Sequence, residues 1–153
     1  MFCFHLRVRG PLGHFALDET SARPRCLIGA GCGFGPILSM LRHLADIQDM
    51  QPTTLIFAAN LEDEMFGAEA TIQQLQTALP KLTVMLTVWH PQGSWSGLTG
   101  TAADAFAAAL DKAAELPDVY VCGPPALLES VKAVAKARGL PPTQIFTEQV
   151  QPG

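Results

Sequence analysis

The sequence lacks any run of lysine or arginine: its 10 basic residues are outnumbered by 14 acidic ones, and the formal net charge at pH 7 is −4. A surface that binds a nucleic-acid backbone needs clustered positive charge, so we expect no nucleic-acid partner. No apolar run approaches the roughly 20 residues that a membrane helix requires. Residues 1–7 become charged too early for the apolar part of a secretory signal. We therefore predict a cytoplasmic protein that does not enter a membrane.

Closely spaced cysteines and histidines are also missing. The four cysteines, Cys3, Cys26, Cys32 and Cys122, have neither the spacing of a zinc site nor the C-x4-C-x2-C spacing of a plant-type iron–sulfur cluster. The four histidines, at positions 5, 14, 43 and 90, show no metal-binding spacing. We expect reduced thiols rather than disulfides, as is usual in the cytosol, and no metal site.

What the sequence does contain is an alternation of short and long apolar segments. Continuous runs at 26–29, 53–59, 82–88 and 119–122, with a shorter one near 144–147, are typical of strands buried on both faces. Helix-spaced segments lie near 36–44, 67–79, 101–115 and 125–138. In 153 residues that are 48% hydrophobic, this pattern predicts an α/β domain with three layers, α/β/α, around a parallel sheet.

The first 20 residues depart from this alternation. Residues 6–9, 10–13 and 15–17 have the pattern of a strand, a turn and a second strand in an antiparallel element. A linker at about 20–25 follows. We therefore divide the chain into a remnant of another domain at 1–20 and the α/β domain at 21–153.

A glycine-rich segment, Gly-Ala-Gly-Cys-Gly-Phe-Gly-Pro at 29–36, joins the first predicted strand to the first predicted helix. Main-chain N–H groups and the positive end of the helix converge there, which favours an anion such as a phosphate. A tight turn without a ligand is the alternative, although four glycines in seven positions exceed what one turn requires. The residues predicted to bind the anion are Gly31, Cys32, Gly33, Phe34, Gly35 and Pro36.

More specific nucleotide-binding and catalytic motifs do not match the sequence. The Gly-x-x-x-x-Gly-Lys-Ser/Thr phosphate loop is absent, and the dinucleotide fingerprint beginning at Gly29 would need glycine at Phe34. The segment at 93–97 has Trp95 where a hydrolase nucleophile elbow needs serine, so we discount hydrolase chemistry.

A second candidate lies at the end of the fourth predicted strand, where Cys122 is followed by Gly123, Pro124 and Pro125. The carboxyl ends of parallel strands line the crevice in which open α/β sheets bind ligands. A lone cysteine at such a position is more often an inert small hydrophobic residue. The Gly-Pro-Pro that follows, which turns the chain away, favours a ligand-binding role.

Taken together, the segments at 29–36 and 119–125 and the residue Glu148 resemble, in order and interval, the nicotinamide domain of the ferredoxin–NADP reductase superfamily. The resemblance covers residues 6–153. The segments at 9–15 and 88–97 further resemble the reductase components (component C) of soluble methane monooxygenase and related multicomponent monooxygenases. The resemblance implies a five-stranded parallel sheet with strand order 3-2-1-4-5.

Reductases of this kind consist of a [2Fe–2S] ferredoxin domain, a β-barrel FAD domain and an NADH domain, and they pass electrons to a di-iron hydroxylase. The resemblance implies that residues 21–153 are the NADH domain, with NADH and FAD as cofactors, and that residues 1–20 are a remnant of the FAD barrel left by truncation. The implied partners are the FAD and [2Fe–2S] domains and the hydroxylase.

The resemblance also implies roles for individual residues. The glycine segment would hold the NADH pyrophosphate, and Cys122 to Pro125 would lie beside the nicotinamide. Cys122 and Glu148 are the implied catalytic residues, Cys122 orienting the nicotinamide and Glu148 making a polar contact or relaying a proton near the flavin. The reaction would be hydride transfer from nicotinamide C4 to flavin N5, for which this domain supplies position rather than chemical groups.

Charge favours NADH over NADPH. A coenzyme 2′-phosphate needs arginine or lysine near the end of the second strand, whereas residues 58–64 contain three carboxylates and no cation. We assign Asn60 and Glu62 to the coenzyme site on this ground.

Two other functions stay open. The first is a catalytically silent nucleotide-binding module. It would account for three departures from the family pattern: Ala30 and Cys32 stand in place of the usual glycine and threonine, and Val150 stands in place of an aromatic residue. A flavodoxin-like domain that holds FMN itself would also bind phosphate at the first strand–helix loop.

Overall fold

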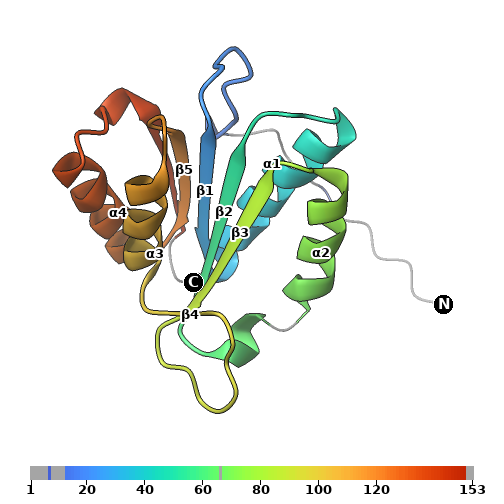
Figure 1. Cartoon of the computed structure of the whole chain (residues 1–153), viewed down its shortest axis with the longest axis vertical. Helices are drawn as coiled ribbons and strands as arrows, with labels where there is room; N and C mark the ends of the chain where they lie inside the picture. Colours follow the sequence, from blue (N-terminus) through green and yellow to red (C-terminus); the bar gives the residue numbers. More distant parts are fainter. Residues whose placement is uncertain (1–6, 8–12, 66, 151–153) are drawn as a thin grey trace.

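The computed structural model describes residues 7, 13–65 and 67–150, which form one parallel sheet with helices on both faces (Figure 1). Its strands are β1 (Arg25–Ala30), β2 (Thr53–Ala59), β3 (Leu82–Val88), β4 (Leu98–Thr99), β5 (Asp118–Gly123) and β6 (Ile145–Gln149). The helices are α1 (Phe34–Asp46), α2 (Ala68–Ala78), α3 (Ala102–Lys112) and α4 (Pro125–Ala137). Short 3-10 turns lie at η1 (Gly31–Gly33), η2 (Glu62–Met65) and η3 (Pro142–Gln144).

The strand order is β4-β3-β2-β1-β5-β6, with every neighbouring pair parallel. The expected order 3-2-1-4-5 corresponds to β3-β2-β1-β5-β6 and is confirmed. The predicted count of five strands is wrong, because β4 adds a sixth at the edge of the described sheet. Its two residues are exposed and too few to show a strand's alternation, so the sequence does not reveal it.

Successive residues of the central strands pack on opposite sides of the sheet. Val119 and Val121 of β5 belong to the core under α3 and α4. Tyr120 and Cys122 belong to the core under α1 and α2. Figure 1 shows these two helix pairs on opposite faces. The continuous apolar runs of the sequence follow from this two-sided burial.

All four predicted helices form, with small shifts at their ends. α1 begins at Phe34 rather than Pro36, and α3 ends at Lys112. The start of α3 is fixed by a capping box, in which Thr101 Oγ1 accepts from the Asp104 main-chain N–H and the Asp104 carboxylate accepts from the Thr101 N–H.

The expected antiparallel element at the N-terminus is not found in the described residues. Residues 15–17 form no strand, and most of the strand and turn predicted before them (6 and 8–12) lies outside the described residues. Instead, the ring of Phe15 packs edge-on against Tyr120 with centroids 6.4 Å apart. The Tyr120 hydroxyl accepts a hydrogen bond from the Asp18 main-chain N–H at 2.9 Å. Contact with the sheet therefore replaces strand pairing in this segment.

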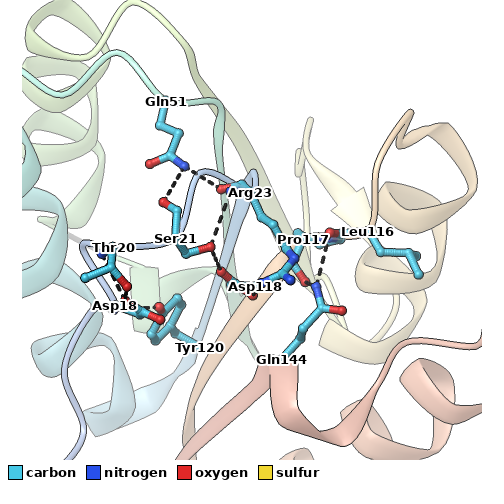
Figure 2. Close-up of polar contacts among 10 residues, drawn as sticks. All are labelled: Asp18, Thr20, Ser21, Arg23, Gln51, Leu116, Pro117, Asp118, Tyr120 and Gln144. Atoms are coloured by element: carbon cyan, nitrogen blue, oxygen red, sulfur yellow. Dashed lines mark hydrogen bonds and ion pairs between the residues drawn. The ribbon is translucent and has the colours of Figure 1, made fainter.

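The linker that enters β1 is held by polar side chains at the amino end of the sheet (Figure 2). The buried carboxylate of Asp118 accepts hydrogen bonds from Ser21 Oγ and, at 3.5 Å, from Arg23 Nη1. The side-chain amide of Gln51 donates to the carbonyl oxygens of Ser21 and Arg23 at 2.9 and 2.8 Å. Residues 18–25 are thus part of the α/β unit and not a free tether.

We expect Asp118→Ala to lower the free energy of unfolding by about 1–3 kcal/mol, because the hydroxyl of Ser21 and the side chain of Arg23 lose a buried acceptor. Urea denaturation of the full chain measures this change. Asp111→Ala is the matched control, since it removes an exposed carboxylate that pairs with Arg138 at 2.8 Å and should cost less. Equal losses in the two variants would contradict a structural role for Asp118.

Candidate functional site

The two glycine-bearing turns follow β1 and β5, which the expected strand order makes neighbours, and they lie side by side. β1 and β5 are parallel neighbours with Gly29 opposite Cys122, so the turns that follow both strands leave the same edge of the sheet. A methyl group at Gly33 would lie 2.1 Å from the carbonyl oxygen of Cys122, so only glycine permits this contact between the main chains. The predicted proximity of the two turns is confirmed.

The first turn presents main-chain N–H groups at the amino end of α1. Gly31 adopts a φ of +53°, and both Gly31 and Cys32 are exposed. No side chain caps the helix, and its first turn contains no acidic residue. The positive end of this 13-residue helix is therefore available to an anionic ligand.

A cavity of about 540 Å³ opens at this edge of the sheet. It extends from the ends of β1, β2 and β3 to the first residues of α3 and α4. Of the predicted site residues, Gly31, Cys32, Asn60 and Pro124 line it. Its volume is within the range of small-molecule and cofactor sites.

Other predicted residues support the cavity without lining it. Gly33 is buried against the second turn, and the ring of Phe34 stacks on Phe57 with centroids 4.1 Å apart. Phe34 therefore packs in the core rather than beside a ligand. Predicted residues that are likewise not on the cavity wall are Gly35, Pro36, Gly123 and Pro125.

The two predicted catalytic residues are neighbours, with Cys122 on β5 opposite Glu148 on β6. Cys122 is fully buried in the core under α1, whereas Glu148 is exposed. Burial, and secondarily the negative charge of Glu148, raises the pKa of the Cys122 thiol to about 11. A thiol with this pKa is neutral at pH 7 and does not act as a thiolate.

The acidic residues after β2 take different roles. Both carboxylate oxygens of Glu62 accept from the Gln92 main-chain N–H, at 2.9 and 2.8 Å, and join the turn after β2 to the loop after β3. Glu64 lines the cavity and accepts from the Asn60 N–H at 3.0 Å. The sequence did not distinguish these carboxylates, because their directions depend on the 3-10 turn η2.

Several residues on the cavity wall were not among the predicted site residues, and they include Glu64, Trp89, Thr101, Leu127, Ser130 and Val150. A signal for Trp89 was present, since it directly follows a buried strand and so lies at the same edge as the glycine turns. Val150 lies beside the second turn because its N–H donates to the Gly123 carbonyl at 3.0 Å.

The cavity is weakly charged. Glu64 is the one charged residue among those that line it, and no lysine, arginine or histidine does so in the described part of the chain. Within residues 7, 13–65 and 67–150, no group of three or more histidine, cysteine, aspartate or glutamate side chains could hold a metal ion. No helix in the same residues is long and apolar enough to cross a membrane.

Comparison with known proteins gives consistent matches. Methane monooxygenase component C of Methylosinus trichosporium is 33% identical over 104 residues, which are 68% of this chain and 30% of that protein. The 2-halobenzoate 1,2-dioxygenase electron transfer component of Burkholderia cepacia is 30% identical over 145 residues, which are 94% of this chain and 42% of that protein. The chain thus spans less than half the length of these relatives.

A solved structure agrees with the sequence matches. The flavohem-like FAD/NAD-binding domain of nitric oxide dioxygenase from Vibrio cholerae O1 biovar El Tor superposes with a TM-score of 0.74 at 26% identity, over 93% of this chain and 56% of that one. The family model described as the oxidoreductase NAD-binding domain matches residues 27–133, which include both glycine-bearing turns. The chain therefore belongs to the oxidoreductase NAD-binding domain family, within the ferredoxin-reductase superfamily.

Proposed function

We propose that this domain binds NADH in the cavity at the carboxyl edge of the sheet and presents the nicotinamide to FAD held by another domain of a longer reductase. Electrons then pass to a [2Fe–2S] centre and to a di-iron hydroxylase. The observation that carries the proposal is the meeting of the two glycine-bearing turns beside one cavity, at the uncapped amino end of α1. The names of the two relatives, both components of oxygenase systems, support the role as a reductase component.

The order of the strands along the carboxyl edge of the sheet supports one orientation of the coenzyme in the cavity. Along the edge, the order β3, β2, β1, β5 brings Trp89, Asn60, Gly31 and Pro124 into sequence across the cavity. Three strand spacings span about 14 Å, which suits an extended dinucleotide. The pyrophosphate belongs at Gly31 and Cys32, which are exposed on the cavity wall at the uncapped amino end of α1, so the adenosine extends toward β2 and β3 and the nicotinamide toward β5.

At the nicotinamide end, this chain supplies position and shielding. FAD supplies the hydride acceptor when it is bound. Pro124 lines the cavity at this end, and Cys122, two residues earlier, is buried in the core under α1 and α2, from where we expect it to affect the position of this turn. We expect the flavin to approach beside Glu148 in β6 and Val150 just after it, since the first is opposite Cys122 and the second is hydrogen-bonded to the Gly123 carbonyl. Alignment of donor and acceptor is the main contribution that such a site can make to hydride transfer.

Binding of NADH is tested by protection of a thiol. Iodoacetamide should alkylate the exposed Cys32 in the folded chain, and saturating NADH or ADP-ribose should slow this reaction at least about tenfold by covering it. Cys26 and Cys122 should not react, because burial raises the pKa of Cys26 to about 12 and that of Cys122 to about 11. Peptide mass spectrometry on a Cys3→Ser background measures each site.

The proposal is contradicted if neither ligand changes the rate of Cys32 alkylation and a calorimetric titration shows no heat of binding. Protection by FMN instead of NADH would favour a flavodoxin-like site.

The preference for NADH over NADPH should depend on Glu64, which is the charged residue on the cavity wall. We expect Glu64→Lys to lower the ratio of the NADPH Kd to the NADH Kd by about tenfold, because the reversed charge attracts the 2′-phosphate instead of repelling it. Glu69→Lys makes the same charge change at an exposed position of α2 and is the matched control. The same ratio in both variants would remove Glu64 from coenzyme selection.

Cys122→Ala tests the nicotinamide end in the full-length reductase, with its FAD domain. We expect the rate of flavin reduction by NADH to fall about tenfold or more while the Kd for NADH changes by less than about threefold, because the thiol orients the ring rather than holding the coenzyme. Stopped-flow absorbance of the flavin measures the rate. Cys26→Ala, which removes a buried thiol on the opposite face of the sheet, controls for general loosening of the core. If flavin reduction keeps its rate, Cys122 has no part in the reaction.

A further inference from the structure

Trp89 is the exposed aromatic side chain that the fold does not explain. Its exposed fraction is 53%, and it is the one aromatic among the large exposed hydrophobic residues of the described chain. It lies directly after β3 and forms part of the cavity wall. An exposed indole on a cavity wall offers a flat, largely apolar surface that a ligand in the cavity can cover.

The position of the indole is fixed by the main chain. The N–H of Trp89 donates to the Ala59 carbonyl at 3.0 Å, and the N–H of His90 donates to the Asn60 carbonyl at 2.9 Å. These bonds continue the pairing of β2 with β3 beyond the strands. The indole stacks on the His90 ring with centroids 4.4 Å apart at 27°, which covers one face, and about half of the side chain stays exposed.

The loop that follows Trp89 is closed and anchored. Its base is joined where the Gly100 N–H donates to the Val88 carbonyl at 3.0 Å. Its tip is tied to the turn after β2 through Gln92 and the Glu62 carboxylate, at 2.8 Å. A wall formed before the ligand arrives loses little conformational freedom on binding.

We propose that Trp89 stacks on the adenine base of the coenzyme and selects for a dinucleotide with an aromatic base at that end, an inference that rests on the proposed function. If the pyrophosphate lies at Gly31 and the nicotinamide toward β5, the base lies toward β3, where the cavity wall includes Asn60, Glu64, Trp89, Gly100 and Thr101. Of these, the indole offers a flat apolar surface to a purine. Glu62 is then a positioning residue that holds the loop carrying this surface.

The test compares Trp89→Ala and Trp89→Phe in the full chain by calorimetry with NADH and with ADP-ribose. Loss of base stacking on an aromatic ring should raise both Kd values about tenfold in Trp89→Ala. Trp89→Phe keeps an aromatic face and should stay within about threefold of the unchanged chain. Met50→Ala, which removes another exposed hydrophobic side chain far from the cavity lining, is the matched control.

Fluorescence gives a second measurement, because the chain has two tryptophans. In Trp95→Phe the remaining indole is Trp89, and ADP-ribose should quench its emission; in Trp89→Phe the quenching should be lost.

The outcomes separate the two proposals. If the unchanged chain binds neither NADH nor ADP-ribose, the proposed function itself fails. If it binds both but Trp89→Ala binds them equally well, or if quenching persists only when Trp95 remains, adenine stacking on Trp89 is overturned while NADH binding stands.

Discussion

The contact between Gly33 and the Cys122 carbonyl determines the shape of the whole carboxyl edge. Because β1 and β5 are adjacent and parallel, the turns after them leave the sheet at one place, and any side chain at position 33 would separate them. Their contact closes the edge beneath the cavity and directs the amino end of α1 toward it. The other parts of the site follow from this arrangement: Asn60 and Trp89 are placed by the pairing of β2 and β3 with β1.

The sequence was sufficient for the features that depend on local pattern. The apolar runs identified β1, β2 and β5 because both faces of these strands are buried, as the alternate assignment of Val119, Tyr120, Val121 and Cys122 to two cores shows. They also marked β3 and β6, whose residues are less buried. The glycine segment located the start of α1 to within two residues, and the helix-spaced apolar residues from position 101 onward located the start of α3, which Thr101 caps. The proximity of the two turns came from strand order, which the resemblance supplied and composition alone could not.

The sequence could not reveal the side-chain directions that depend on how the turns and helices fold. Glu62 and Glu64 are two residues apart with the same chemistry, yet one ties down a loop and the other lines the cavity, because η2 turns them differently. Phe34 belongs to the glycine segment but stacks on Phe57, since α1 begins at that residue. The edge strand β4 depends on the closed loop before it, whose shape is set by contacts such as Trp95 Nε1 donating to the Leu98 carbonyl at 2.8 Å.

At the proposed nicotinamide end, the residue Cys122 is neutral and fully buried. A thiolate beside a reduced nicotinamide would add negative charge without a partner, and the burial that raises the pKa of Cys122 prevents this over the physiological range. The exposed carboxylate of Glu148, opposite Cys122 on β6, reinforces the neutral form. Hydride transfer requires that two ring atoms approach closely and remain aligned, and a small uncharged side chain on a strand that is buried on both faces meets that requirement better than a mobile charged one. The pairing of β5 with β6 therefore bears on the proposed reaction through the position and charge of Glu148 beside Cys122.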